Sequence, residues 1–382
     1  MRRTTDTTDS TAARAAAPAD RPEGSGGAGS PGRLRALVEA EYGGIGGGYV
    51  NTATLGLPPA RTAAALRGAL DAWAAGRPDV AAYEAAVAAS RAAYARITGV
   101  AVERVALAGT VAGSVGLIAA QLPEGADVVV AADDFSSLVH PFAGRPGLSL
   151  RIVPLAEVAS AVRPDTALVA VSAAQSLDGR VADLPAIRAA ATEHGARVLI
   201  DGTQSVGWLP LAPDMYDYLV CHAYKWLLSP HGACFLTVRE GLEATLSPAF
   251  AGWYAADDPW ESCYGPIADL APGARQFDAR PAYLSFVGAA ASLSLIEEVG
   301  VPAVNAHDLA LAARLRAGLT ALGRTPVPGD SAIVAVPGMP ATAPARLQQA
   351  GVRFAARAGN LRFAFHLHNT EADVDLVLNA LG

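Results

Sequence analysis

Lysine is almost absent from this chain of 382 residues. Lys225 is the only one, and the other 28 of its 29 basic residues are arginine. Arginine replaces lysine in most surface ion pairs, but its guanidinium does not lose its proton. A lysine amine loses its proton when burial or a neighbouring charge lowers its pKa, and the neutral amine then attacks carbonyl groups. Lys225 is therefore either a chance survivor on the surface or a residue kept for Schiff-base chemistry.

Cysteine, charge and long apolar runs are also scarce. The cysteines Cys221, Cys234 and Cys263 lack zinc spacing, and three do not suit a disulfide framework, so we expect no metal and a reducing, cytoplasmic location. Charged residues make up 17% of the chain and the net charge is -7, which argues against a nucleic-acid partner. Although 52% of the residues are apolar, no uninterrupted run of about 18 occurs, so we expect no membrane span.

The length is sufficient for one large and one small domain. Residues 1–34 are rich in small and polar residues without hydrophobic periodicity, which predicts a disordered tail. Arg2 and Arg3 are not followed by an apolar stretch, so no signal peptide is expected. We assign residues 35–285 to a large domain and residues 286–382 to a small C-terminal domain.

Segments of helical and strand-like pattern alternate from about residue 85 onward, which is typical of a mostly parallel α/β sheet. The predicted helices cover residues 84–99, 111–122 and 182–195, and a long apolar helix follows residue 285. The predicted strands lie within residues 104–110, 127–134, 166–175, 196–204, 216–224 and 232–240. Near the C-terminus, RFAFHLHN (362–369) alternates like an antiparallel strand, and Thr370 with Asp373 forms a plausible capping box.

A lysine that forms a Schiff base needs a suitable cofactor beside it. Pyridoxal phosphate offers an aldehyde for the amine, a pyridine nitrogen that must stay protonated, a ring to be stacked and a phosphate to be anchored. Asp201 ends a predicted strand, at the sheet edge where ligands bind, and there it could pair with the pyridine nitrogen; a turn aspartate is the commoner outcome. The strand-to-helix junction 110–114, with Val111 and Ala112, could hold phosphate through backbone amides.

Three aromatic residues complete this set of candidates. Period-two alternation places His222 and Tyr224 on one face just before the lysine, where both could donate to phosphate or could simply be packed. Phe135 follows a predicted strand and could stack on the cofactor ring, although an ordinary core phenylalanine is equally compatible with the sequence.

DGTQ (201–204) followed by AYKWLLSPHG (223–232) resembles the DGxQ and HKW/YKW segments of the class V aminotransferase family. These are fold type I pyridoxal phosphate enzymes that include cysteine desulfurases, kynureninase and isopenicillin N epimerase. The resemblance runs from about residue 49 (YVNTATLGLPP) to the C-terminus and keeps the family's order of motifs. It implies a large, mostly parallel seven-stranded sheet domain, a small C-terminal αβ domain, and a homodimer in which both chains build each site.

The resemblance also implies roles for the residues around the lysine. Lys225 is the Schiff-base lysine, Asp201 the partner of the pyridine nitrogen, and Gln204 the donor to the 3-oxygen of the ring. His222 and Tyr224 occupy phosphate-binding positions.

More distant positions complete the implied site. Phe135 stands where the family has a stacking histidine, and Arg280 where a partner chain touches phosphate, although FDARPA is one residue shorter than the family's FExGTP. Arg362, in LRFAFHLHNTEADVD, matches the arginine that binds the substrate carboxylate, and Arg357 matches a second family arginine. Asn51, in YVNTATLGLPP, falls in the substrate-binding part. The implied substrate is an α-amino acid.

The reaction is indicated by what the chain lacks relative to the family. Cysteine desulfurases carry a nucleophilic cysteine before the carboxylate-binding arginine, and GVRFAARAGNLR (351–362) has none, so persulfide transfer is disfavoured. AAQSLDG has Gln175 as a substitute for a family asparagine near the cofactor. Three further segments, within residues 122–142, 251–265 and 277–290, look most like the actinobacterial branch that contains the ergothioneine-pathway lyase. The resemblance therefore implies a carbon-sulfur β-lyase of secondary metabolism that acts on an S-substituted cysteine or its sulfoxide, with Lys225 as general base.

Several alternatives stay open at this point. A decarboxylating deaminase, an epimerase or an aminotransferase would use the same residues. A non-catalytic pyridoxal phosphate-binding module is disfavoured because Lys225 is present and no helix-turn-helix segment or basic patch appears. Four aromatic residues either line the site beside a bulky S-substituent or, as is commoner, pack between domains or subunits: Trp253, Tyr254, Trp260 and Tyr264.

Overall fold

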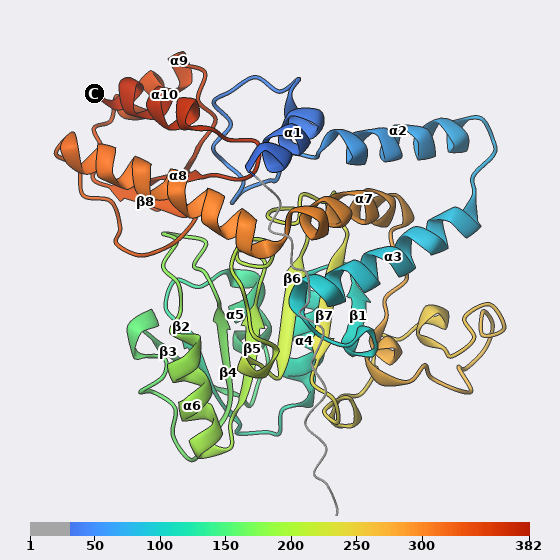
Figure 1. Cartoon of the computed structure of the whole chain (residues 1–382). Helices are drawn as coiled ribbons and strands as arrows, with labels where there is room; N and C mark the ends of the chain where they lie inside the picture. Colours follow the sequence, from blue (N-terminus) through green and yellow to red (C-terminus); the bar gives the residue numbers. More distant parts are fainter. Residues whose placement is uncertain (1–30) are drawn as a thin grey trace, which may run out of the picture.

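The computed structural model describes residues 31–382 and contains a large sheet of seven strands and a small sheet of three (Figure 1). The predicted disordered tail, residues 1–34, lies outside the described residues except for its last four. Residues 31–34 instead begin helix α1 (Pro31–Tyr42), because Leu34 and Leu37 share an apolar face that packs against the core.

The large sheet has the strand order β1-β7-β6-β5-β4-β2-β3, in which β7 runs antiparallel to both of its neighbours and the other pairs are parallel. Its strands are β1 (Val105–Ala108), β2 (Asp127–Ala131), β3 (Ser149–Val153), β4 (Thr166–Ser172), β5 (Arg197–Asp201), β6 (Tyr218–His222) and β7 (Cys234–Val238). The predicted mostly parallel seven-stranded sheet is thus confirmed. The edge strand β3 was not predicted because it lacks a continuous apolar run and leaves Ile152 exposed.

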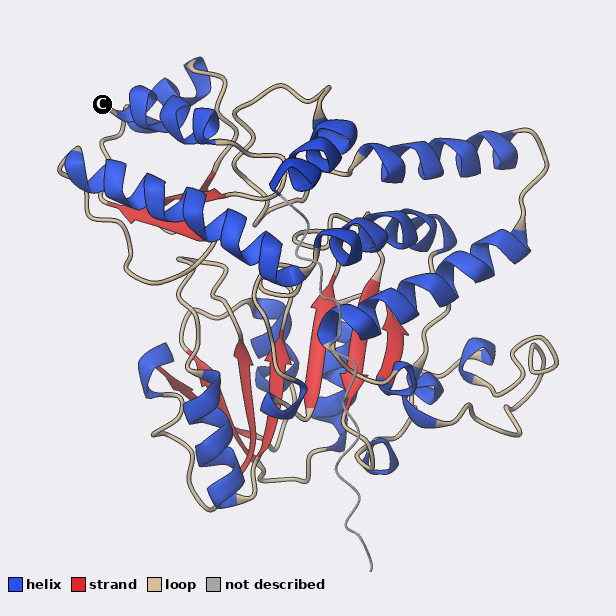
Figure 2. Cartoon of the chain, in the orientation of Figure 1, coloured by secondary structure: helices blue, strands red, loops and turns tan. Residues whose placement is uncertain are grey.

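Helices cover both faces of this sheet, so that its strands are apolar on both sides (Figure 2). The helices are α2 (Ala60–Ala74), α3 (Val80–Thr98), α4 (Val111–Gln121), α5 (Ser136–Ala143), α6 (Leu184–His194) and α7 (Tyr283–Val299). Val128 and Val130 of β2 belong to the core with helices α4 and α5, whereas Val129 belongs to the core with α3, α6 and α7, because side chains alternate across a strand.

The small sheet lies near the C-terminus and has the order β8-β10-β9, with both pairs antiparallel. Its unit contains α8 (Val301–Ala321), β8 (Ile333–Pro337), α9 (Ala343–Gln349), β9 (Ala355–Arg357), β10 (Asn360–Ala364) and α10 (Glu371–Leu381). Tyr49 and Asn51 form isolated bridges with Arg353 and Ala364, so a segment far away in the sequence joins this unit. The division into residues 35–285 and 286–382 stays a prediction.

One strand prediction near the C-terminus was too long. RFAFHLHN (362–369) alternates throughout, but β10 ends at Ala364. The backbone amide of His366 donates to Asn369 Oδ1 at 3.0 Å, and the backbone amide of Asn369 donates to the carbonyl of His366 at 2.8 Å, so residues 366–369 form a turn. The predicted capping box of Thr370 and Asp373 is confirmed at the start of α10.

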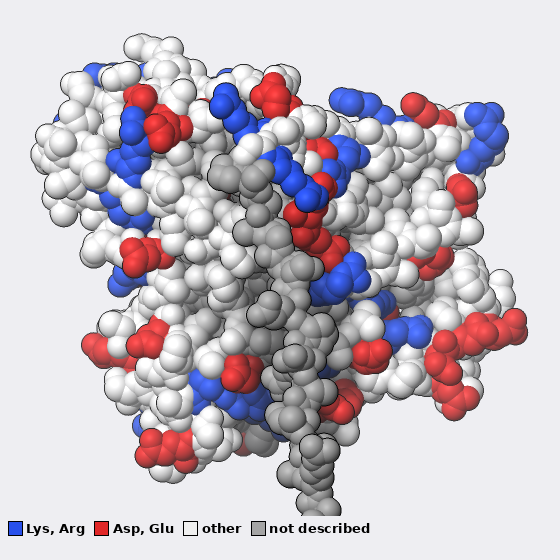
Figure 3. Space-filling model, viewed as in Figure 1, with Lys and Arg blue, Asp and Glu red and all other residues white. Residues whose placement is uncertain are grey.

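Within residues 31–382, no single helix is both long and apolar enough to cross a membrane. Helices α7 and α8 reach that length together, but they are bent by 82° at their junction. On the face drawn in Figure 3, acidic and basic side chains are interspersed over most of the surface, and a group of acidic side chains lies at the lower right.

Candidate active site

A cavity lies where the parallel strands β4, β5 and β6 end. The last residues of these strands, Ser172, Asp201 and His222, all line it, because the carboxyl ends of parallel neighbours meet at one edge of a sheet. Seven of the residues predicted from the sequence line this cavity together: Val111, Phe135, Asp201, Gln204, His222, Tyr224 and Lys225. Ser137, Ser172, Ser176 and Thr203 also line it and were not predicted.

Lys225 is a buried residue of the cavity, not a surface survivor. Its side chain is only 4% exposed. The pKa of its amine is lowered to about 8, chiefly by burial; the carboxylate of Asp201 raises this pKa, and the positive charge of Arg362 lowers it. The neutral, nucleophilic form of the amine is therefore well populated at mildly alkaline pH.

Asp201 is a buried carboxyl group at the end of β5. Its Oδ1 accepts a hydrogen bond from the backbone amide of Thr203 at 2.8 Å. Burial nevertheless raises its pKa to about 6, although the Thr203 contacts and Lys225 lower it. No salt bridge to Asp201 occurs within residues 31–382, so this carboxylate would gain a partner from a protonated pyridine nitrogen.

His222 and Tyr224 lie in contact at the end of β6. Their rings meet edge to face at 4.5 Å, and the exposed His231 stacks on Tyr224 at 3.9 Å. Burial lowers the pKa of His222 to about 4, and its Nε2 accepts from the backbone amide of Gly232 at 3.2 Å. The neutral imidazole therefore carries its hydrogen on Nδ1, so His222 offers an N–H donor and Tyr224 a hydroxyl at this end of the strand.

Val111 and Ala112 are the first two residues of α4, and Val111 lines the cavity while Ala112 is exposed beside it. Thr110 caps the helix, since its Oγ1 accepts from the backbone amide of Gly113 at 3.1 Å. The first amides of a helix have no acceptor within it and carry the positive end of the helix dipole. This end of the cavity suits a phosphate group.

Phe135 precedes α5, and its half-exposed ring has its centroid 5.4 Å from Lys225 Nζ. Asp134 holds this residue, because its carboxylate accepts from the backbone amide of Phe135 at 2.7 Å and from the amide and hydroxyl of Ser172 at 2.8 and 2.5 Å. Gln175 also donates to Asp134, at 3.1 Å, rather than lining the cavity. Asp134 was not among the predicted site residues, although an acidic residue at the end of a predicted strand was the sign by which it could have been found.

Gln204 has both hydrogens of its side-chain amide engaged, and its amide oxygen accepts one hydrogen bond. Its Nε2 donates to the carbonyl of Ala53 at 2.9 Å and to Ser176 Oγ at 3.0 Å, and its Oε1 accepts from Trp226 Nε1 at 2.9 Å. The indole donor fixes which way the amide points. Donation to the 3-oxygen of a cofactor ring would therefore require Gln204 to exchange its bond to Ser176.

Arg362 is a buried guanidinium, 2% exposed, that reaches the cavity wall from β10. It donates to the backbone and hydroxyl oxygens of Ser176 and, at 2.8 Å, to Thr54 Oγ1, while its Nε has no hydrogen-bond partner. No carboxylate of residues 31–382 forms a salt bridge with it. The pKa of Arg362 is lowered to about 10, because burial disfavours its charged form and the positive charge of Arg357 repels it. A buried cation without a counterion is costly, so an anionic ligand would stabilise it.

The remaining predicted residues do not line the cavity. Arg357 is exposed on β9, and Asn51 has a buried side-chain oxygen without a hydrogen-bond partner. Arg280 is exposed, with its guanidinium carbon 5.9 Å from the Trp253 ring. Its predicted contact with the phosphate of a partner subunit stays a prediction, as does the homodimer.

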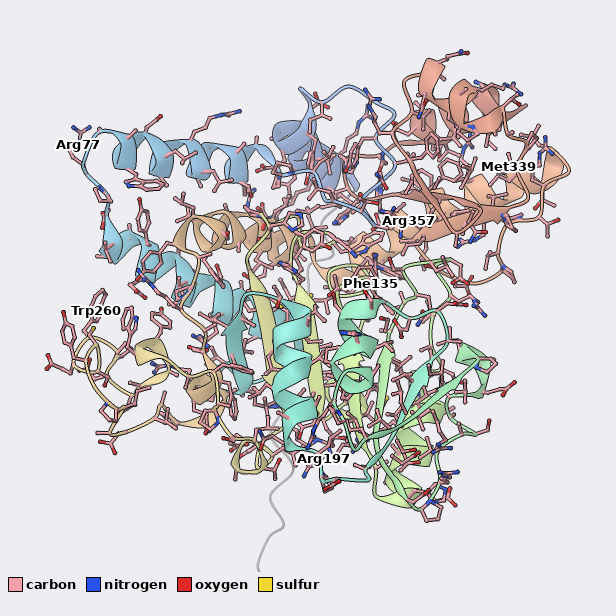
Figure 4. All side chains as sticks on the ribbon, turned by 180° about the vertical axis from the view of Figure 1, so that it is seen from behind. Arg77, Phe135, Arg197, Trp260, Met339 and Arg357 are labelled. Atoms are coloured by element: carbon pink, nitrogen blue, oxygen red, sulfur yellow. The ribbon has the colours of Figure 1, made fainter. Side chains whose placement is uncertain are left out.

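The aromatic residues considered for the S-substituent lie elsewhere. Trp253 packs against Tyr254 and Trp260, and the Tyr254 hydroxyl donates to Glu84 at 2.5 Å. Figure 4 shows Trp260 at one side of the molecule, and Phe135 near its middle, where the large sheet meets the small unit. Tyr264 is 95% exposed, and none of the four aromatic residues lines the cavity of its own chain.

The residues of the cavity fit pyridoxal phosphate. They supply a buried amine of lowered pKa, a buried carboxylate without a salt-bridge partner, an aromatic ring and a helix N-terminus, which match the aldehyde, pyridine nitrogen, ring and phosphate in turn.

Comparisons with known proteins agree with this fit. Residues 108–377, more than half of the chain, match the family model described as aminotransferase class-V. The chain is 27% identical over 226 residues to the uncharacterized aminotransferase YcbU of Bacillus subtilis, which covers 56% of the chain and 60% of that protein. It is 37% identical over 163 residues to a kynureninase of Stenotrophomonas maltophilia, covering 40% of the chain and 38% of the kynureninase. The matches thus span less than two thirds of these relatives.

Solved structures resemble the whole fold. The complex of the cystine C-S lyase C-DES with its reaction product cysteine persulfide gives a TM-score of 0.79 at 21% identity, covering 89% of this chain and 98% of C-DES. The apo cysteine desulfurase of Thermococcus onnurineus NA1 gives a TM-score of 0.78 at 18% identity, covering 90% and 96%. The chain therefore belongs to the class V aminotransferase family and is a pyridoxal phosphate-dependent enzyme of fold type I.

Proposed function

We propose that this enzyme is a carbon-sulfur β-lyase that cleaves an S-substituted cysteine, or the sulfoxide of one, in natural-product metabolism of the ergothioneine type. The observation that carries the amino acid part of this proposal is Arg362, a buried cation without a carboxylate partner, joined through Ser176 to the cavity of Lys225. A planar guanidinium binds a carboxylate with two parallel hydrogen bonds, which suits the α-carboxylate of an amino acid.

The residues of the cavity divide the reaction between them. When bound, pyridoxal phosphate supplies the electron sink that makes the α-carbon of an amino acid acidic. Asp201 holds a negative charge for the pyridine nitrogen, while Arg362 orients the α-carboxylate. Lys225, as a neutral amine, removes the proton from the α-carbon. The carbon-sulfur bond then breaks with its electron pair on sulfur, and with one water the products are pyruvate, ammonia and the thiol or its oxidised equivalent.

The cysteines favour direct release of the sulfur product. Burial raises the pKa of the thiols of Cys221 and Cys234, which suppresses the thiolate form. Cys263 is exposed, and no cysteine lines the cavity. A sulfur-accepting thiolate is therefore missing from the cavity wall, and elimination needs none. The name of C-DES, a cystine C-S lyase whose reaction product is cysteine persulfide, supports the same class of reaction for this chain.

The test is incubation of the purified holoenzyme with S-alkylcysteines and their sulfoxides. We expect pyruvate and ammonia in equal amounts, with the sulfur product released into solution. Lys225→Ala and Lys225→Arg should both abolish turnover, because guanidinium stays charged and neither variant offers a neutral amine. Exchange of the amino group, inversion at the α-carbon or release of carbon dioxide without pyruvate would instead identify an aminotransferase, an epimerase or a decarboxylating enzyme.

A further inference from the structure

Three consecutive carbonyl groups hold the chain on either side of Lys225. The carbonyl of Tyr224 accepts from the backbone amide of Gly56 at 2.9 Å, and that of Lys225 accepts from the amide of Leu228 at 3.2 Å. The carbonyl of the next residue, Trp226, lies 2.9 Å from Nε2 of the His366 imidazole. A carbonyl only accepts, so Nε2 of His366 must carry the hydrogen.

His366 is fully buried and comes from the small unit, just beyond β10. It stands four residues after Arg362, and both side chains reach the large domain, Arg362 at Ser176 and His366 at Trp226. Trp226 in turn donates its indole hydrogen to Gln204. The contact of His366 thus ties the lysine segment to the strand that carries Arg362.

The other nitrogen of His366 faces a buried acid. Nδ1 lies 3.6 Å from Oδ2 of Asp308 on α8, and both residues are 0% exposed. Neither Nδ1 nor either oxygen of Asp308 has a hydrogen-bond partner within residues 31–382. His366 is the only salt-bridge partner of Asp308 among these residues.

The free-energy cost of a buried net charge determines how many protons His366 and Asp308 hold together. An isolated buried carboxylate costs far more free energy than a neutral carboxyl group, and burial raises the pKa of Asp308 and lowers that of His366 to about 3. One proton therefore stays on Nε2, and a second stays on either Nδ1 or the carboxyl group of Asp308, so the pair has no net charge. Wherever the second proton resides, His366 remains an Nε2–H donor.

The ionisable groups around the two sites are separate. Those that act on His366 besides Asp308 are His307 and His368, and Tyr42 lies near Asp308. Those that act on Lys225 are Asp201, Arg362, Cys221 and Arg357.

We propose that His366 and Asp308 are positioning residues for Lys225. As a buried, uncharged pair they hold the Trp226 carbonyl, and they thereby keep the amine at a position in the cavity that is shielded from water. This inference rests on the proposed role of Lys225. Because neither residue lines the cavity, their effect reaches the reaction through Trp226, whose backbone joins Lys225 directly.

The test is a pH titration of the visible absorbance of the holoprotein, which reports the surroundings of the amine. His366→Leu removes the donor to Trp226, lets water approach Lys225 and relieves the burial that disfavours its charged form. We expect the midpoint to move up by about one pH unit, the equivalent of one net hydrogen bond. His366→Gln, whose amide can still donate to Trp226, should titrate close to the wild type.

His368→Leu is the matched control. His368 is half-buried, and its Nε2 lies 3.0 Å from a backbone carbonyl, but that carbonyl is Tyr49, outside the lysine segment. This variant should lose thermal stability yet titrate as the wild type does. Asp308→Leu keeps His366 but removes the acid that fixes its proton, and should move the midpoint in the same direction as His366→Leu.

The outcomes separate this inference from the proposed function. If Lys225→Ala retains the absorbance titration of the wild type, the role of Lys225 itself fails. If that titration depends on Lys225 but is unchanged in His366→Leu, or equally changed in His368→Leu, the positioning role is overturned while the lyase proposal stands. An unchanged titration midpoint in Asp308→Leu would show that Asp308 has no part in positioning Lys225.

Discussion

Arg362 determines, in our proposal, how the enzyme holds the substrate carboxylate. Arg362→Leu should raise KM for an S-substituted cysteine by roughly 100-fold, with a smaller change in kcat, since about 1.5–3 kcal/mol is lost with a hydrogen bond to a charged group. Steady-state kinetics of pyruvate release measures both constants. Arg357→Leu is the control, because Arg357 is exposed and nearby in sequence. Equal effects of the two substitutions would contradict the assignment.

The ionised carboxylate of Asp201 should destabilise the folded apoprotein at neutral pH. Its pKa is raised by burial to about 6, so its stabilising contribution is complete below the unfolded pKa near 4 and is lost as pH rises through 6. The loss should amount to about 1–3 kcal/mol. Asp201→Asn, which still accepts from Thr203, should lack this loss between pH 4 and 7 while its turnover falls sharply.

Urea unfolding of the apoprotein at pH 4 and at pH 7 measures the effect of Asp201→Asn on the unfolding free energy. If the unfolding free energies of the wild type and the variant had the same pH dependence, ionisation of the buried carboxyl group would not destabilise the fold. Near-normal turnover of the variant would contradict the pairing of Asp201 with the pyridine nitrogen.

Single residues differ in how far the sequence reveals them. Lys225 stands out because no other lysine accompanies it, and Asp201 because a polar residue ends an apolar strand. Ser176 carries neither sign, since its importance arises from contacts with Gln204 and Arg362, the latter 186 residues away. Chemistry that depends on residue type is thus visible in the sequence, while chemistry that depends on such distant contacts is not.

At the scale of elements, the turn that contains Lys225 depends on a close approach of Gly56. A Cβ atom on Gly56 would lie 2.1 Å from the carbonyl oxygen of Lys225, so Gly56→Ala must displace the lysine segment. We expect a loss of about 1–3 kcal/mol in unfolding free energy, as for other overpacked sites, together with a weakened visible absorbance of the cofactor.

Gly116→Ala is the control for this substitution. Gly116 lies inside α4, and a Cβ there would meet no atom within 4 Å, so alanine should stabilise the helix by about 0.5–1 kcal/mol. Chemical denaturation and absorbance spectra of the two holoproteins give the comparison. A Gly56→Ala protein with the spectrum and stability of the wild type would contradict the close approach.

The strands could be predicted only in part from the sequence. Buried central strands such as β4 and β5 are continuous apolar runs, and the sequence predicts them. Their order in the sheet, and the antiparallel direction of β7, depend on pairings between distant segments that no local pattern encodes. β9, with three residues, is too short to produce a pattern at all.

At the scale of the whole molecule, residues of the small unit contact the wall and the lysine segment of a cavity that the large sheet forms. Lys225 follows a strand of the large sheet, whereas Arg362, which donates to Ser176 of the cavity wall, and His366, which contacts Trp226, come from the small unit. The resemblance to a family predicted this convergence from the order of motifs; composition and periodicity alone did not, because they carry no information on which elements meet in space.

The last prediction concerns Arg280, which is exposed and does not line the cavity of its own chain. If it reaches the phosphate of a partner subunit, Arg280→Ala should be poorly active and Lys225→Ala inactive alone, yet activity should return when the two are refolded together. Random pairing makes half of the dimers hybrids, and one of the two sites in each hybrid has both residues intact, so roughly a quarter of wild-type activity should return. Pyruvate release from the mixture, with each variant alone as control, measures this recovery. No recovery, or a fully active Arg280→Ala enzyme, would place Arg280 outside the active site.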